Sequence, residues 1–114
     1  MHELSICEAI ADAATRRAQG RPVRRVTVRI GHFCQVVPDS LQFSWELLVA
    51  DTPLAGASLD VEHVPAVAAC AACSAQTHLE LPILVCGACG STDVELVSGR
   101  ELLLVSLDVA EGVR

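Results

Sequence analysis

Two Cys-x-x-Cys pairs, separated by twelve residues, constrain this 114-residue chain more than any other feature. Each pair places two thiolates on one tight turn, and two such turns facing each other supply four sulfur ligands in a closed tetrahedral site. Metal–sulfur distances of about 2.3 Å in such a site suit structural zinc. The expected zinc ligands are Cys70, Cys73, Cys86 and Cys89.

The expected compartment decides between a metal and disulfides. Glu3, Glu8 and Asp12 interrupt the first turns, so the start of the chain lacks the basic and apolar regions of a signal peptide. The longest nearly apolar run, VPAVAACAAC, is far shorter than the roughly 20 residues of a membrane span. We therefore expect a soluble, cytoplasmic protein with no membrane partner, in which six cysteines favour metal ligation.

Other metal chemistries fit these cysteines less well. Redox iron in a rubredoxin-like site is usually surrounded by aromatic residues, and the sequence has none after Trp45. A zinc deaminase needs His-x-Glu well upstream of its Pro-Cys-x-x-Cys, whereas His78 and Glu80 lie between the two cysteine pairs. A catalytic zinc is also disfavoured, because four thiolates leave no position open for water.

The distribution of charge argues against nucleic-acid binding. The net charge is −6, there is no lysine, and six of the eight arginines fall between residues 16 and 29. From residue 30 to residue 99 the chain has no basic residue other than histidine, while Glu80, Asp93 and Glu95 are acidic. A ribbon that binds phosphate needs cations to displace counterions. A structural ribbon that binds protein or handles metal remains.

Hydrophobic periodicity predicts an α+β fold with two helices and three strands. Helical spacing covers residues 5–19 and 38–50. Ser5 and Glu8 fit a capping box at the start of the first helix, although a start one turn earlier is equally compatible with the sequence. Alternation typical of half-buried strands covers 24–31, 58–64 and 102–109. The expected apolar stripe of the first helix is Leu4, Cys7, Ala11, Ala14 and Ala18, widened by Ile6 and Ile10.

The last strand indicates how the chain is divided. It is too apolar to stand alone, so we expect it to return to the first two strands and complete a small sheet. The cysteine segment then becomes an insertion. The predicted domains are an α+β domain of residues 1–65 and 93–114 and a zinc-ribbon insertion of residues 66–92.

The first three residues, Met-His-Glu, form a second candidate metal site. An α-amine, backbone amides and the imidazole of His2 lie within one short stretch of chain. These nitrogens can close fused chelate rings around an ion that prefers planar nitrogen ligands, which means Cu(II) or Ni(II). Taken alone, such a dipeptide is more often an ordinary exposed terminus.

Over essentially its whole length the chain resembles the HypA/HybF family, the nickel metallochaperones of hydrogenase maturation. The resemblance combines the initial MHE, the helix after Leu4 and Ser5, the two cysteine pairs and the late SGREL. It also includes the segments RRVTVRIG, PDSLQFSWE and SLDVEHVP. Together these features are specific, whereas MHE or the cysteine pairs alone would not suffice.

The resemblance implies a function and two metal sites. The family delivers Ni(II) to the large subunit of a [NiFe]-hydrogenase, and in some organisms to urease, with a partner GTPase of the same pathway. Its nickel site maps onto Met1 through amine and backbone, His2 through imidazole and amide, and Glu3 chiefly through its backbone. Its structural zinc site maps onto the four cysteines named above. Nickel is then transient cargo, the α+β part is the nickel-binding domain, and the protein is a monomer or homodimer.

The segment GHFCQV departs from the family pattern, which more often has an acidic or small residue after the glycine. His32 and Cys34 are therefore unusual. An auxiliary metal site is one interpretation, and a loop histidine beside a buried cysteine is the favoured one. Cys7 is expected in the core. His63 is expected to be partly exposed on its strand, although it could approach the amino terminus.

Two other functions remain as alternatives to a non-enzymatic nickel metallochaperone. The first is a zinc-ribbon adaptor or regulatory module that binds only protein, in which MHE is incidental. An enzyme ranks third, because the sequence contains no recognisable pair of nucleophile and base and no open catalytic metal site.

Overall fold

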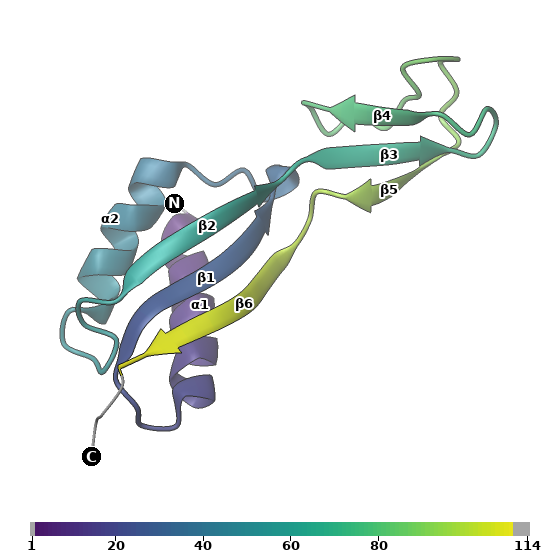
Figure 1. Cartoon of the computed structure of the whole chain (residues 1–114). Helices are drawn as coiled ribbons and strands as arrows, with labels where there is room; N and C mark the ends of the chain where they lie inside the picture. The colour runs from purple at the N-terminus through teal and green to yellow at the C-terminus, as the bar shows by residue number, and fades with distance from the viewer. Residues whose placement is uncertain (1, 111–114) are drawn as a thin grey trace. The chain divides into compact units, whose positions relative to one another are not determined.

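The structure is a computed structural model that describes residues 2–110; residues 1 and 111–114 lie outside the description (Figure 1). Its elements are α1 (His2–Ala18), β1 (Val23–Gly31), η1 (His32–Cys34), α2 (Pro38–Val49), β2 (Ser58–Val64), β3 (Ala66–Cys70), β4 (Gln76–Leu79), β5 (Val94–Ser98) and β6 (Leu102–Val109).

The chain divides into two compact units, which we call the first and the second unit. The first unit contains the chain up to Arg29, Val36–Glu62 and the chain from Leu103 onward, and the second contains Ile30–Gln35 and His63–Leu102. As statements about domains, the predicted boundaries at residues 66 and 92 stay a prediction.

The predicted α+β fold with two helices and a three-stranded sheet is confirmed. The strand order is β2-β1-β6, so the last strand of the chain lies beside the first, as its apolar sequence predicted. Figure 1 shows α1 behind this sheet. In β1, Val26, Val28 and Ile30 are buried, while Arg25 and Arg29 are exposed. The buried side chains therefore lie on one face of the sheet, which packs against the helices.

Helix α1 begins at His2, the earlier of the two starts that the sequence left open, so the predicted capping box at Ser5 and Glu8 is wrong. The physical reason lies in Glu3, which is 3% exposed. Its carboxylate accepts a hydrogen bond of 3.0 Å from the amide of Val37, the N-cap residue of α2. The buried Glu3 carboxylate thus links the starts of the two helices. Hydrophobic periodicity does not reveal such a contact.

The buried stripe of α1 matches the prediction at five of its seven positions, and only Leu4 and Ala11 are not buried. Leu4 is 47% exposed, and Glu3 takes the position on the buried face that Leu4 was expected to fill. The buried residues of the helix are Glu3, Ile6, Cys7, Ile10, Ala14 and Ala18. Their spacing of three and four residues is that of one helix face.

Helix α2 supplies the largest core side chain. Leu41, Trp45 and Val49 are buried, and the indole nitrogen of Trp45 donates a hydrogen bond of 2.9 Å to the carbonyl of Ala57. Phe43 is exposed because it lies two residues from Leu41 and Trp45, on the opposite face of the helix. The first unit therefore has a compact apolar core.

The second unit contains a sheet that the sequence did not predict. Its order is β4-β3-β5, and both pairs are antiparallel. The buried side chains of β3, Ala66, Ala68 and Cys70, alternate along the strand. These side chains are small, so the apolar core beneath this sheet is thin.

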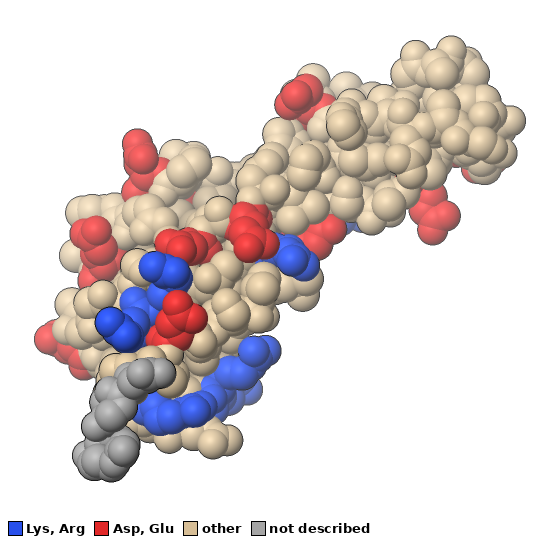
Figure 2. All heavy atoms as spheres, in the orientation of Figure 1, with Lys and Arg blue, Asp and Glu red and all other residues tan. Residues whose placement is uncertain are grey.

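The arginines of the first unit are interleaved with carboxylates (Figure 2). Arg25 pairs with Asp60 at 3.3 Å and Asp108 at 3.6 Å, and Arg29 pairs with Glu62 at 2.9 Å. These contacts spread positive and negative charge over the same face.

No helix in the described part of the chain is long and apolar enough to cross a membrane.

Candidate metal centre

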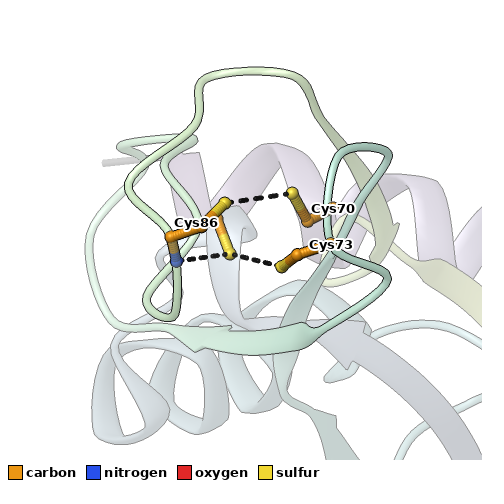
Figure 3. A group of neighbouring side chains, drawn as sticks. Cys70, Cys73 and Cys86 are labelled. Carbon is orange, nitrogen blue, oxygen red and sulfur yellow. Dashed lines mark hydrogen bonds between the residues drawn. The ribbon is translucent and has the colours of Figure 1, made fainter.

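The four cysteines of the two pairs meet at one end of the second unit. Cys70 is the last residue of β3, Cys73 follows on the same turn, and Cys86 and Cys89 lie on a second turn between β4 and β5. All four sulfur atoms lie within 4.8 Å of one another. Figure 3 shows the first turn facing Cys86 across the site. The structure thus brings together every residue of the predicted thiolate set.

The sulfur–sulfur distances are those of a tetrahedral metal site. The Sγ atoms of Cys70 and Cys89 lie 3.7 Å apart, and those of Cys73 and Cys86 lie 3.6 Å apart. A tetrahedron with metal–sulfur bonds of about 2.3 Å has edges of about 3.8 Å, whereas a disulfide needs about 2.05 Å. The group therefore fits a four-thiolate metal site and does not fit a pair of disulfides.

The two turns have the same backbone geometry, which explains why each can hold two thiolates. In the first turn the amide of Cys70 donates to Ala75 at 2.9 Å, and the amide of Ser74 donates to Cys70 at 3.0 Å. In the second turn the amide of Cys86 donates to Ser91, and that of Gly90 to Cys86, both at 2.9 Å. Equivalent hydrogen bonds fold both turns around the same centre.

The residue after each pair has a left-handed backbone, with φ of 65° at Ser74 and 77° at Gly90. This conformation destabilises a folded non-glycine residue by about 1–2 kcal/mol. Glycine avoids this strain but loses about 0.5–1 kcal/mol more than other residues through backbone entropy on folding. We expect Ser74→Gly to tighten zinc binding up to about fivefold, since 1.4 kcal/mol is tenfold.

Gly90→Ser should weaken zinc binding by a similar factor, because a Cβ at this position meets nothing within 4 Å and only its backbone conformation is strained. Competition with a chromophoric chelator measures both affinities. Equal affinities for the wild type and both variants would contradict a shared strained turn.

The ionisation of the cysteines is uneven. The amides of Cys89 and Ala88 donate to the sulfur of Cys86 at 3.4 Å and 3.3 Å and lower the pKa of its thiol to about 6. The amide of Ala75 lowers the pKa of Cys73, but its neighbouring cysteine sulfurs, Cys86 foremost, and burial together outweigh that amide and raise the pKa to about 12. Cys86 is therefore a thiolate at neutral pH, the form that binds metal.

Two of the three predicted nickel residues, His2 and Glu3, lie at the start of α1. Met1 lies outside the described residues. His2 is the first residue of the helix, and its Nε2 lies 3.8 Å from the carboxylate of Glu3. The carboxylate of Glu3 is already engaged by the amide of Val37. A contribution of Glu3 to metal binding through its backbone, as predicted, leaves this contact intact.

The remaining cysteines have structural surroundings. Cys7 is buried, its thiol donates to the carbonyl of Leu41 at 3.4 Å, and burial raises its pKa to about 11. The prediction that it belongs to the core is confirmed. Cys34 is half-buried, and its thiol donates to the carbonyl of Glu101 at 3.4 Å.

Sequence reasoning missed one contact between candidate residues. His32 and His63, considered separately in the sequence, have ring nitrogens 3.4 Å apart. They are 31 positions apart, and no local pattern connects them. The two histidines meet because the fold places η1 next to the end of β2.

A four-thiolate site on paired turns, joined to an α+β unit of two helices and three strands, defines a small metal-binding protein with a ribbon-like metal site. Residues 1–109 match the family model described as "Hydrogenase/urease nickel incorporation, metallochaperone, hypA". The chain belongs to this HypA family of metallochaperones.

Individual relatives span nearly the whole chain. A hydrogenase maturation factor HypA of Streptomyces avermitilis is 42% identical over 117 residues, which is 98% of this chain and 89% of the relative. The HypA of a Nostoc species is 36% identical over 111 residues and 97% of each chain.

Two solved structures share the fold. The solution structure of the nickel metallochaperone HypA from Helicobacter pylori has a TM-score of 0.63 at 24% identity, covering 96% of this chain and 97% of that one. A second HypA solution structure has a TM-score of 0.62 at 27% identity, with the same coverage. The α+β architecture is therefore that of HypA proteins.

Proposed function

We propose that this protein binds Ni(II) at its amino terminus and delivers it to the large subunit of a [NiFe]-hydrogenase, with structural zinc held by the four cysteines. The observation that carries this proposal is the match of residues 1–109 to the nickel-incorporation family. The Met-His-Glu start and the four-thiolate cluster supply the two donor sets that such a role requires.

Zinc is the ion that fits the cysteine site best. Its four sulfur donors and tetrahedral spacing match a structural zinc centre. The proposed ligands are Cys70, Cys73, Cys86 and Cys89. Because all four positions around the ion are filled by protein, the zinc stabilises the second unit and does not bind a reacting water.

Nickel is proposed to bind the amine of Met1, the imidazole and amide of His2, and the backbone of Glu3. Nitrogen ligands of this kind favour a tetragonal or square-planar ion. Helix α1 begins at His2, and the first four amides of a helix take no part in its own ladder of hydrogen bonds. Metal binding by the amides of His2 and Glu3 therefore leaves that ladder intact.

The site does not by itself select nickel, because the same nitrogen ligands bind Cu(II) more tightly. Selectivity for nickel comes from metal availability and from the partner proteins, which are a maturation GTPase and the hydrogenase large subunit, with urease as a further client.

The protein acts in the cytoplasm, where cysteines stay reduced and able to bind zinc. The first unit carries nickel and the second zinc.

Metal analysis after equilibrium dialysis against Ni(II) tests this function on the untagged protein. We expect one zinc per chain and at least one further equivalent of nickel that exchanges while the zinc stays. The alternative function, a zinc-ribbon adaptor, predicts one zinc and no nickel at the amino terminus, so blocking the terminal amine would leave the nickel content unchanged. In that case the chain would share the HypA fold without carrying its cargo.

A further inference from the structure

Two histidines from distant parts of the chain face each other in the second unit. His32 lies in η1 and His63 near the end of β2. Nδ1 of His32 is 3.4 Å from Nε2 of His63, the ring centroids are 5.5 Å apart, and the ring planes are at 84°. This separation exceeds the roughly 2.7–3.2 Å of a well-formed N–H hydrogen bond. A direct hydrogen bond therefore explains the pair poorly.

The other nitrogen of His32 determines which atom faces His63. Nε2 of His32 lies 2.8 Å from the carbonyl oxygen of Glu80. A carbonyl can only accept, so Nε2 carries the hydrogen and Nδ1 of the neutral ring keeps its lone pair, directed at His63. Metal-binding histidines are commonly oriented in this way, with the outer N–H donated to a backbone carbonyl.

We propose that His32 and His63 together bind a divalent transition-metal ion, at a site distinct from the four cysteines and from the amino terminus. Metal–nitrogen bonds of about 2.0–2.1 Å at angles of 90–109° place two ligand nitrogens about 2.9–3.4 Å apart. The observed separation of 3.4 Å is the upper end of this range. Imidazole suits Ni(II) and Zn(II), and water completes the coordination.

The pair is both held in place and accessible. The amide of Gly31 donates to Glu101 at 2.8 Å and that of Phe33 to Gly99 at 2.7 Å, so the backbone on either side of His32 is fixed. The His32 side chain is 29% exposed, and His63 is exposed. The carboxylate of Glu80 lies 3.6 Å from Nε2 of His32 and adds negative charge beside the pair. An ion can therefore enter without rearranging the strands.

The four histidines of the chain provide a matched experiment. All proteins carry His2→Ala, which removes the imidazole at the terminus, and all are checked for one zinc per chain. Calorimetric titration with Ni(II) then compares this background with His32→Gln, His63→Gln and the control His78→Gln. His78 is an exposed histidine in β4 of the same unit.

We expect the background protein to bind one equivalent of Ni(II). Affinity should fall at least about tenfold on loss of either His32 or His63, since even outer contacts of a metal ligand are worth about 10–100-fold. The control should bind as the background does. A background protein that binds no nickel, or a control that loses as much affinity as His63→Gln, overturns the proposal.

A second readout does not depend on the variants folding. In the His2→Ala protein, paramagnetic Ni(II) should broaden the imidazole NMR signals of His32 and His63 at substoichiometric metal, before those of His78. Equal broadening of all three rings would mean unspecific binding and would overturn the site. Neither measurement depends on the amino-terminal site, so this inference and the proposed function fail separately.

Discussion

Cys73→Ala is expected to abolish zinc binding and unfold the metal-binding part of the second unit. The buried hydrophobic residues of this part are small, and two of them are ligands: Ala66, Ala68, Cys70 and Cys86. Such a core stabilises little without metal. Structural zinc supplies roughly 10–16 kcal/mol of apparent free energy in comparable small sites. Loss of one of the four thiolates removes most of this free energy of zinc binding.

The first unit should survive the same change, because its core does not include the metal. Leu41, Trp45 and Leu54 are each 1% exposed and belong to the first unit. Hydrogen exchange measured by mass spectrometry should therefore show lost protection over residues 66–98 and retained protection in α1 and α2.

Cys34→Ala is the matched control for this experiment, since Cys34 is half-buried in the same unit but is not a ligand. It should keep one zinc and normal protection in residues 66–98. If Cys73→Ala also kept its zinc and its protection, the structural role of the metal would be wrong.

Gly31→Ala should destabilise the protein by about 3 kcal/mol, near the upper limit for an overpacked site. Gly31 has φ of −75° and ψ of 153°, a conformation open to any residue, so glycine is not needed for its backbone angles. It is needed for space. A Cβ at this position would overlap the carbonyl group of Gly99 and lie 2.6 Å from the nitrogen of Arg100.

The overlap cannot relax easily, because the amide of Gly31 donates to the carbonyl of Glu101 at 2.8 Å and holds the two strands together. Gly20→Ala is the control: Gly20 has φ of 84°, and a Cβ there meets nothing within 4 Å. We expect this control to cost only about 0.5–1 kcal/mol, because the backbone strain of about 1–2 kcal/mol is partly offset by the lower backbone entropy of alanine in the unfolded chain, about 0.5–1 kcal/mol. Urea unfolding of both variants measures the difference. Equal costs would contradict the steric explanation.

The elements with a clear hydrophobic period were predictable. Val26, Val28 and Ile30 alternate in the sequence and are buried in β1, and the four cysteines, which the two pairs predicted as one ligand set, meet in space. The start of α1 could not be decided from the sequence, because its first buried contact is the carboxylate of Glu3. Periodicity reads only apolar residues, so a buried charge does not extend the pattern.

The second sheet was missed for a different reason. The strand β3 reads AVAAC, and alanine has low strand propensity. This strand exists because β4 and β5 pair with it on both sides and the cysteine turns close its end. Such long-range pairing, like the contact of His32 with His63, has no local signal in the sequence.

Titration of Ni(II) into proteins with free and blocked amino termini tests whether the nickel site lies at the amino terminus. Untagged protein is compared with His2→Ala and with a chain extended by two residues before Met1, all with equal zinc content. The amine and the imidazole must both be deprotonated to bind metal.

We expect the tightest nickel-binding step only in untagged protein, and its affinity should fall as the pH drops, because protons compete with the metal for both nitrogens. The extension and His2→Ala should each remove this step without changing the zinc content. If the extended chain binds nickel as tightly as untagged protein, the amino terminus is not the nickel site.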